Sequence, residues 1–458
     1  MSANIWCKSQ LFRQTISARS TPWFNWRNHI QDSWAFMIFD PKWMPFWIEQ
    51  TCRAAREDGF LPRCSARVPG LPFPDQRHPD IATWTAFCAA RYFAETGDRS
   101  LFSKTIEVAG GTKKTTILDA IVSGLQWLLD HRGSHGMVLF LDGDWSDPLE
   151  EAGKLGIGES PWTTMALINA LNNFVPVLRK IGSVDLADTF GAEITKLTGA
   201  VNSSAWDGNW YIRGIDDSGK PFSTASDPDG NVSLLMQAWA VLSGVSSPER
   251  TKLLVAAVDK NNKTSIGPIL YGPPFLKQRP WIGRETAKMP GTCVNGSVYL
   301  HVSMMWSMVE FILGRPDQGL EVLHQSLALS EGGDLNKRKA IPLWMPNYWH
   351  GPHSQTPGQV GETMTSAGPP WFIVIMFEYV FGLKAEFDGL RIQPCFPSTW
   401  QTGSCQRPYR GSMLNFEFNR DSSIKGIVVT MDGKALEKQL IPSDLKMGSY
   451  NIKVIIGN

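Results

Sequence analysis

Residues 117–131 read ILDAIVSGLQWLLDH and indicate best how the chain folds. Apolar side chains recur there at intervals of three and four residues, the period of an amphipathic helix with one buried face. The same period returns in four other segments: 162–181, 234–245, 298–313 and 371–381. Long segments rich in proline and glycine, such as 67–79 and 266–292, separate these helices. We therefore expect a mainly α-helical toroid whose long loops carry the function.

The pattern changes at about residue 384. Residues 412–418, 426–431 and 450–456 alternate apolar and polar side chains or run through β-branched ones, and turn residues separate them. This pattern predicts a small antiparallel β-sandwich that follows the helical part in the sequence. The sequence therefore predicts two domains: 1–383 and 384–458.

Charge and composition exclude several classes of function. The chain has 44 Lys and Arg against 43 Asp and Glu, so its net charge of +1 provides no field for nucleic acid or an anionic membrane. No stretch approaches ~18 uninterrupted apolar residues, so no membrane span is expected. The nineteen tryptophans fit either packing between helices or a carbohydrate cleft, where flat rings meet the C–H faces of sugars.

Seven cysteines without paired spacing argue against a disulfide framework and for a reducing compartment. The first eight residues, MSANIWCK, lack an apolar signal core. We therefore expect a cytoplasmic protein, and we expect no metal site. The oligomeric state stays open, with a homodimer as one alternative.

The residues that carry chemistry lie in 143–149, GDWSDPL, and in 158–162, GESPW. Two carboxylates flank an indole in the first motif. A carboxylic acid kept protonated beside an aromatic wall acts as a general acid on a leaving oxygen, and Trp145 offers a face on which a sugar ring stacks. Read from the residues alone, the motif fits equally a polar turn around a half-buried tryptophan.

Other motifs occur along the whole chain in a fixed order: RNHIQD at 27–32, WDGNWYIR at 206–213, QAWAVLSG at 237–244, PG at 290–291, NG at 295–296 with His301, and FEY at 377–379 before FDGLRIQPC at 387–395. Together with the first two motifs, they resemble the inverting phosphorylases of glycoside hydrolase family 94. This family acts on cellobiose, chitobiose, laminaribiose and β-1,2-oligoglucans. Asn28 replaces an aspartate of the family motif, and Ser146 replaces an asparagine.

The resemblance implies an (α/α)6 barrel whose loops at one end build the active site, followed by the family's C-terminal β-domain. Full-length relatives carry a large β-sandwich before the barrel, and this chain lacks it. Either the protein dispenses with that domain or the chain is a fragment.

The resemblance also assigns roles to single residues. Asp147 matches the general acid that protonates the glycosidic oxygen, and we expect a Trp-lined, partly desolvated pocket to raise its pKa. Asp32 matches an aspartate that holds hydroxyls of the sugar whose bond is broken. Arg27 is expected to guide phosphate or sugar, with a surface ion pair as the alternative. Arg284 and Glu285 begin a loop that we expect to reach the leaving-group sugar.

Phosphate would be held by three further residues. His301 matches a phosphate-contacting histidine, although its place on an apolar helix face is also typical of a core histidine. Thr365 and Ser366 offer hydroxyl groups in the loop that cradles phosphate in the family. This loop departs from the family pattern, because two prolines at 369 and 370 remove N–H donors and Glu362 adds a negative charge just before it.

These assignments leave three hypotheses. In the leading one, phosphate attacks the anomeric carbon of a β-linked oligosaccharide while Asp147 protonates the leaving oxygen, which yields an α-sugar 1-phosphate. This reaction needs no cofactor beyond inorganic phosphate as co-substrate. An inverting hydrolase instead needs a second carboxylate about 6.5–9.5 Å away to activate water, and Glu362 is the candidate. The third alternative is a non-catalytic carbohydrate-binding relative.

Overall fold

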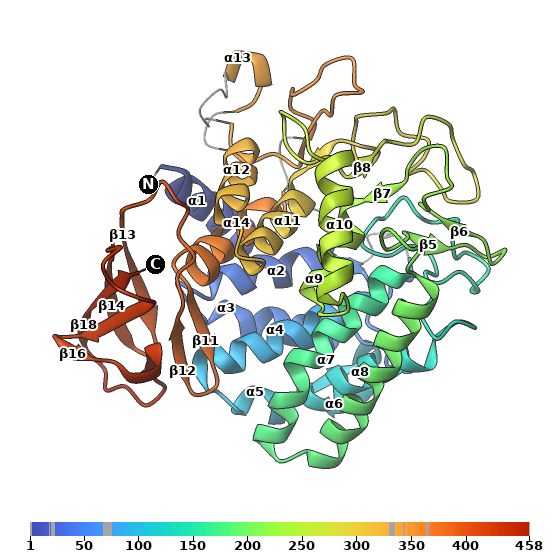
Figure 1. Cartoon of the computed structure of the whole chain (residues 1–458). Helices are drawn as coiled ribbons and strands as arrows, with labels where there is room; N and C mark the ends of the chain where they lie inside the picture. Colours follow the sequence, from blue (N-terminus) through green and yellow to red (C-terminus); the bar gives the residue numbers. More distant parts are fainter. Residues whose placement is uncertain are drawn as a thin grey trace.

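The computed structural model describes residues 2–17, 19, 23–66, 76–328, 335–341, 344–362 and 366–457. Helices are the main regular elements before residue 381, and strands dominate after it (Figure 1). Within the described ranges, no helix is long and apolar enough to cross a membrane.

Six helices of the described chain form a closed cycle, in which each contacts the next and the last contacts the first. These inner helices are α2 (Trp26–Phe36), α4 (Ile81–Thr96), α7 (Pro161–Ile181), α9 (Leu234–Leu242), α11 (Leu300–Ile312) and α14 (Gly368–Val374), which continues as the π-helical turn η3 (Ile375–Val380). Their side chains are mostly buried, so together they build the main hydrophobic core.

A second set of helices alternates with the inner ones along the chain and packs outside them. These outer helices are α1 (Ser2–Ser17), α3 (Trp43–Arg53), α6 (Ile117–Asp130), α8 (Val184–Ser204), α10 (Pro248–Asn261) and α12 (Pro316–Ser326). Shorter elements complete this part: α5 (Ser100–Ser103), the hairpin β3 (Thr105–Val108) and β4 (Lys113–Thr116) around η2 (Ala109–Gly111), and α13 (Leu335–Arg338).

Four two-stranded pairs hold together the loops through which the chain enters the inner helices. They are β1 (Trp23–Asn25) with β2 (Cys64–Ala66), β5 (Gly214–Ile215) with β6 (Pro221–Phe222), β7 (Val232–Ser233) with β8 (Tyr271–Gly272), and β9 (Val298–Tyr299) with β10 (Tyr348–Trp349). Because β1, β7 and β9 directly precede α2, α9 and α11, the long loops gather at the N-terminal ends of the inner helices. This loop end holds the candidate site.

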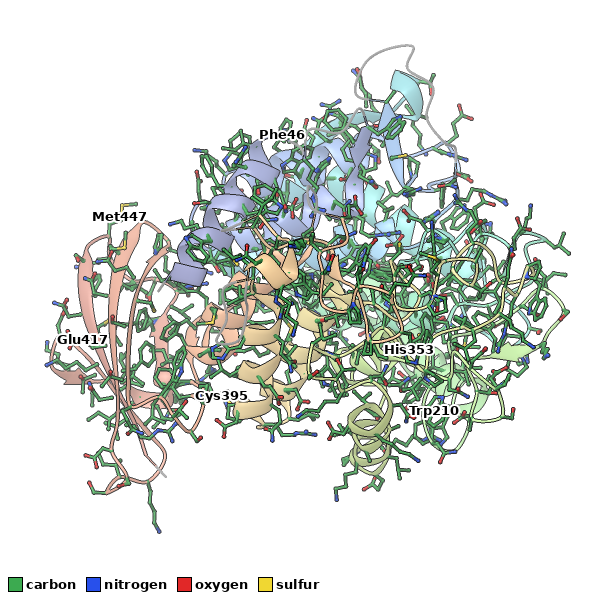
Figure 2. All side chains as sticks on the ribbon, turned by 90° about the horizontal axis from the view of Figure 1, so that it is seen from above. Phe46, Trp210, His353, Cys395, Glu417 and Met447 are labelled. Atoms are coloured by element: carbon green, nitrogen blue, oxygen red, sulfur yellow. The ribbon has the colours of Figure 1, made fainter. Side chains whose placement is uncertain are left out.

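The strands of the C-terminal region form two sheets. The smaller has the order β11 (Leu383–Glu386), β12 (Gly389–Ile392), β17 (Leu440–Pro442), and the larger the order β13 (Thr402–Tyr409), β14 (Ser412–Arg420), β18 (Ser449–Ile456), β15 (Ile427–Met431), β16 (Lys434–Ala435), with η4 (Glu437–Gln439) before β17. Figure 2 shows Glu417 and Met447 in this region, the loop residues Trp210 and His353 on the opposite side, and Cys395 between them.

The expected purely antiparallel arrangement is wrong, because β14 and β18 pair in parallel. The chain reaches β18 from β14 through a crossover that contains β15, β16 and β17, and β18 then lies between β14 and β15. A crossover of this kind lets two strands run in the same direction, whereas a tight hairpin cannot. The alternation of side chains predicted the strands but carried no information on their direction.

The five helices expected from periodicity are confirmed, with shifted ends. The helix expected at 234–245 ends at Leu242, just before Gly244, whose φ of 76° is left-handed. The helix expected at 298–313 begins at Leu300, because Val298 and Tyr299 pair with β10. In both cases the apolar pattern extends beyond the helix, into residues that form a turn or a short strand.

Candidate active site

The first carboxylate of the GDWSDPL motif is fixed inside the protein. Asp144 is fully buried and accepts two hydrogen bonds from Arg213, at 2.8 and 2.6 Å. Ser160 Oγ donates to Asp144 Oδ2 at 2.7 Å. Burial alone would raise the pKa of Asp144, but the Arg213 cation and these hydrogen bonds outweigh burial and lower it. Asp144 therefore stays ionised and anchors the loop.

Arg27, in the first turn of α2, binds the backbone of the same loop. Its guanidinium pairs with Asp80 through two contacts of 2.6 and 3.0 Å, and it donates to the backbone oxygens of Asp144 at 2.7 Å and Trp145 at 2.8 Å. Arg27 is only 8% exposed. The alternative of a surface ion pair is wrong, because the ion pair is buried and most donors of Arg27 bind protein groups. The expected role of Arg27 in guiding phosphate or sugar stays a prediction.

Asp147 points the other way, toward the opening of the loop end. Its side chain is 39% exposed, and Arg63 binds its Oδ2 directly. Arg27 Nη1 and His78 Nδ1 each lie 3.4 Å from Asp147 Oδ1. Burial raises the pKa of Asp147, but Arg63, His78 and Arg27 together lower it below its usual value. The expected rise is therefore wrong for this structure, since the prediction counted an apolar wall and missed Arg63 and His78.

His78 closes the site on the side of the loop before α4. It is fully buried, and its Nδ1 lies 3.0 Å from the backbone oxygen of Asp144 and 3.3 Å from Arg27 Nη2. Burial, with Arg63 and Arg27, lowers its pKa to about 4 although Asp147 opposes them. Gly143 packs against this ring with φ 136°, where a Cβ would stand 3.1 Å from two ring atoms.

Trp145 and His301 belong to a buried hydrogen-bonded chain. Trp145 Nε1 donates to His301 Nδ1 at 3.1 Å, and His301 Nε2 lies 3.0 Å from Gln31 Oε1, which also accepts from Trp371 Nε1 at 2.9 Å. Burial, Arg19 and Arg27 lower the pKa of His301 well below its usual value. His301 is therefore a neutral core histidine with both ring nitrogens engaged, and it has no free N–H for phosphate in this arrangement.

Two other expected sugar ligands lie beneath the surface. Asp32 is fully buried and pairs with Arg19 at 2.7 and 2.6 Å. Glu285 is 1% exposed and accepts from Ser146 Oγ and Tyr271 OH. Burial raises the pKa of both carboxyls. Neither faces the opening, so in this structure they support the loops and do not line a sugar subsite.

The remaining expected residues are spread along the rim or lie below it. The side chain of Arg284 is 64% exposed and pairs with Glu150 at 2.6 Å. Ser366 is 1% exposed, and its Oγ accepts from the backbone N–H of Gly368 at 3.0 Å. Thr365 lies outside the described residues.

Glu362 is exposed beside the site and is linked to it through Asn347. Asn347 Nδ2 donates both to Glu362 Oε2 at 2.9 Å and to the hydroxyl of Tyr299 at 3.0 Å. Tyr299 packs edge-on against Trp145, with ring centroids 5.2 Å apart. Burial, Cys293, Glu362 and Asp147 all raise the pKa of Tyr299, so both carboxylates act electrostatically on the same tyrosine.

The site contains residues that the sequence did not indicate as functional: Arg63, His78, Asp80 and Arg213. Arg63 precedes the proline- and glycine-rich loop 67–79, His78 lies within it, and Arg213 ends the WDGNWYIR motif. A long loop of this composition is often functional, and this was the signal in the sequence that could have indicated these residues. The contact of Arg63 with Asp147 could not be predicted, because the two residues lie far apart in the sequence. The described residues hold no cluster of three His, Cys, Asp or Glu side chains suited to a metal ion.

The helical architecture is similar to that of a solved glycoside-cleaving enzyme. It superposes on the GH78 family rhamnosidase of Bacillus sp. GL1 with a TM-score of 0.60, covering 94% of this chain and 40% of that one at 14% identity. The chain thus shares the fold of this rhamnosidase and has a half-exposed carboxylate at its loop end.

The family follows from the sequence comparison. The catalytic domain of the glycosyl hydrolase 94 superfamily matches residues 17–382, and the chain therefore belongs to this superfamily. Over 96% of its length it is 32% identical to 3-O-beta-D-glucopyranosyl-beta-D-glucuronide phosphorylase of Paenibacillus borealis. Over 99% it is 30% identical to cellobionic acid phosphorylase of Neurospora crassa. It spans 58% of the length of each of these relatives.

Proposed function

We propose that this protein cleaves the β-glycosidic bond of oligosaccharides by phosphorolysis, with inversion at the anomeric carbon. The observation that carries the proposal is the half-exposed carboxylate of Asp147 beside the cations Arg63 and Arg27. Phosphate is its own nucleophile, so one enzyme carboxylate suffices, and the partly exposed Arg63 suits an incoming anion. Both relatives are phosphorylases, which points to the same reaction.

In the reaction, Asp147 gives its proton to the glycosidic oxygen as the bond from that oxygen to the anomeric carbon breaks. A phosphate oxygen forms the new bond to this carbon from the opposite face. The products are an α-sugar 1-phosphate and a shortened sugar with a free hydroxyl group. Asp147 ends as a carboxylate and takes up a proton before the next turnover.

Arg63 links phosphate binding to the protonation of Asp147. In this structure Arg63 pairs with Asp147 and helps to lower its pKa, which suits a resting carboxylate but not an acid. A phosphate that draws Arg63 away removes this stabilisation of the carboxylate, so the pKa of Asp147 rises and it accepts a proton. The buried pairs Arg27–Asp80 and Arg213–Asp144 hold the loop in place during the exchange.

The sugar would lie along a row of aromatic rings that leads away from Asp147. Tyr299 stands next to Trp145, and Tyr348 stacks on Tyr299 with centroids 6.1 Å apart and an interplanar angle of 10°. His350 continues the row at 5.9 Å from Tyr348. All three are partly exposed, unlike Trp145, which is 6% exposed. Such flat surfaces suit the C–H faces of sugar rings.

The helical part, residues 1–383, is proposed to be an (α/α)6 barrel, and residues 384–458 a separate β-sandwich domain. The closed cycle of inner helices and the alternation of inner and outer ones support the barrel. We further propose a cytoplasmic protein with no cofactor besides phosphate and no nucleic-acid or membrane partner, supported by seven free cysteines and a net charge of +1. A homodimer stays a prediction.

Hydrolysis is the second candidate, because Glu362 is an exposed carboxylate linked through Asn347 to Tyr299, whose ring packs against Trp145 of the Asp147 loop. One experiment separates the two candidates. The protein is incubated with cellobiose, cellobionic acid, chitobiose and glucosyl-glucuronide, with and without inorganic phosphate, and the products are read by ³¹P and ¹H NMR. Phosphorolysis gives an α-sugar 1-phosphate only when phosphate is present. Equal cleavage without phosphate would instead establish hydrolysis.

A further inference from the structure

The turn that carries Asp147 packs against a second loop, residues 279–286. Asp147 stands at the tip of this turn, which closes through a hydrogen bond from the N–H of Leu149 to the backbone oxygen of Ser146 at 3.2 Å. Ser146 and Pro148, on either side of Asp147, both bind the second loop. The position of Asp147 therefore depends on contacts that its two neighbours make.

Glu285 makes both of these contacts. Its Oε2 accepts from Ser146 Oγ, and its backbone N–H donates to the backbone oxygen of Pro148 at 3.0 Å. Glu285 is 1% exposed and Ser146 2%, so water does not compete for the hydrogen bond between their side chains. A single residue thus holds the chain both before and after Asp147.

Glu285 is itself fixed from another side. Tyr271 OH donates to Glu285 Oε1 at 2.5 Å, and Tyr271 lies in β8, which pairs with β7 directly before the inner helix α9. The buried Arg213 cation stabilises the ionised carboxyl of Glu285. The contact with Ser146 is thereby connected to the helical ring.

The residues before Glu285 extend the same contact. Arg284 Nε donates to Glu150 Oε1 at 2.6 Å. Gly283, with φ 122°, packs so closely that a Cβ would stand 2.5 Å from the backbone oxygen of Pro148. The second loop therefore leaves the turn no room to move toward it.

We propose that Ser146 and Glu285 are positioning residues for acid catalysis, which place the carboxyl group of Asp147 against the glycosidic oxygen. This inference rests on the proposed role of Asp147 as the general acid. Proton transfer needs heavy atoms about 2.6–3.2 Å apart, and a misplacement of about 1 Å can slow a reaction about 10²-fold. Both side chains are buried, so they act through Asp147 and not on the sugar.

Ser146→Ala tests the contact, because it removes the hydroxyl that binds Glu285 and adds no atom. We expect kcat to fall at least about tenfold, while the KM values for sugar and phosphate stay within about threefold. Ser307→Ala is the matched control and should stay within about twofold of the wild type. Ser307 is buried in α11, where its Oγ donates to the backbone oxygen of Gly319 at 2.9 Å. Should Ser146→Ala not fold, Glu285→Met removes the same hydrogen bond from the other side and takes its place.

The decisive measurement repeats Ser146→Ala in the Asp147→Asn variant, with enzyme in excess over sugar so that slow cleavage is measured. A residue that acts through the acid has no further effect once the acid is gone, so the double variant should turn over within about twofold of Asp147→Asn. A purely structural role would lower turnover by the same factor in both backgrounds. That outcome, or wild-type turnover in Ser146→Ala, would overturn the proposal.

The same comparison holds whether phosphate or water attacks, because Asp147 is the acid in both reactions. Cleavage that is equal with and without phosphate would therefore contradict the proposed phosphorolysis and leave the inference on Ser146 and Glu285 to be decided by the double variant.

Discussion

The loop end contains two layers of charged side chains that use the same residue types differently. The buried layer consists of the pairs Arg27–Asp80 and Arg213–Asp144, in which each carboxylate accepts two bonds from one guanidinium. The open layer consists of Arg63, Asp147 and Glu362, which are partly or fully exposed. Buried charges need fixed partners because desolvation is costly, whereas charges near water can exchange them. The buried layer therefore sets position and the open layer is free to react.

The largest effect expected from this comparison is at Asp147. Asp147→Asn keeps the shape of the side chain but has no proton to give, so turnover should fall about 10²–10⁴-fold, as for loss of a general acid. The free energy of unfolding should change by less than about 1 kcal/mol, because Asp147 is half-exposed. Both are measured, by sugar 1-phosphate formation and by urea unfolding.

Asp142→Asn is the matched control for this variant. Asp142 lies five residues earlier in the same loop and pairs with Arg77 at 3.2 Å at the surface. Its loss should leave turnover within about twofold of the wild type, since such exposed pairs contribute little. If turnover of Asp147→Asn stays within tenfold of the wild type, another carboxylate is the general acid.

The second effect is on stability and concerns the buried layer. Arg213→Met keeps much of the apolar stem but leaves the carboxylate of Asp144 buried without its cation. Breaking a buried pair from one side costs about 3–5 kcal/mol, so urea unfolding should shift strongly. A change below 1 kcal/mol would mean that the loop relaxes and that the two layers do not differ as described.

More of the fold than of the candidate site could be predicted from the sequence. Helix periodicity depends on residues close together in the chain, so 117–131 gave α6 to within one residue. The direction of β18 and the contact of Arg63 with Asp147 depend on residues brought together over long distances. The motif located Asp147, but its pKa is set by partners that no local pattern contains.

The same dependence on long-range packing explains why the sequence did not predict that several expected ligands are buried. Asp32, Glu285 and His301 lie in motifs, and a motif residue that holds a loop is as constrained as one that binds substrate. Burial distinguishes the two cases, and it follows only from tertiary packing: each of these three side chains is at most 4% exposed.

The third effect is a change in pH dependence. Arg63 is the strongest charge that lowers the pKa of Asp147, so Arg63→Gln should raise this pKa. A general acid must be protonated, and activity falls as the pH rises through its pKa. The basic limb of kcat/KM should therefore move to higher pH in Arg63→Gln, while the KM for phosphate increases at least tenfold through loss of the cation. An unchanged limb would show that Arg63 does not control Asp147.

The smallest effect is expected at Glu362, and it tests which nucleophile reacts. If phosphate attacks, Glu362 is only a negative charge near the anion, and Glu362→Gln should lower the apparent KM for phosphate while kcat stays within about twofold. Its hydrogen bond with Asn347 can persist with the amide oxygen as acceptor, so the fold should not change. If water attacks, Glu362 is the base, and an amide cannot take the proton, so cleavage would fall about 10²–10⁴-fold. Steady-state kinetics over a range of phosphate concentrations measures both quantities. A large loss of kcat would identify Glu362 as the catalytic base and replace phosphorolysis by hydrolysis as the proposed reaction.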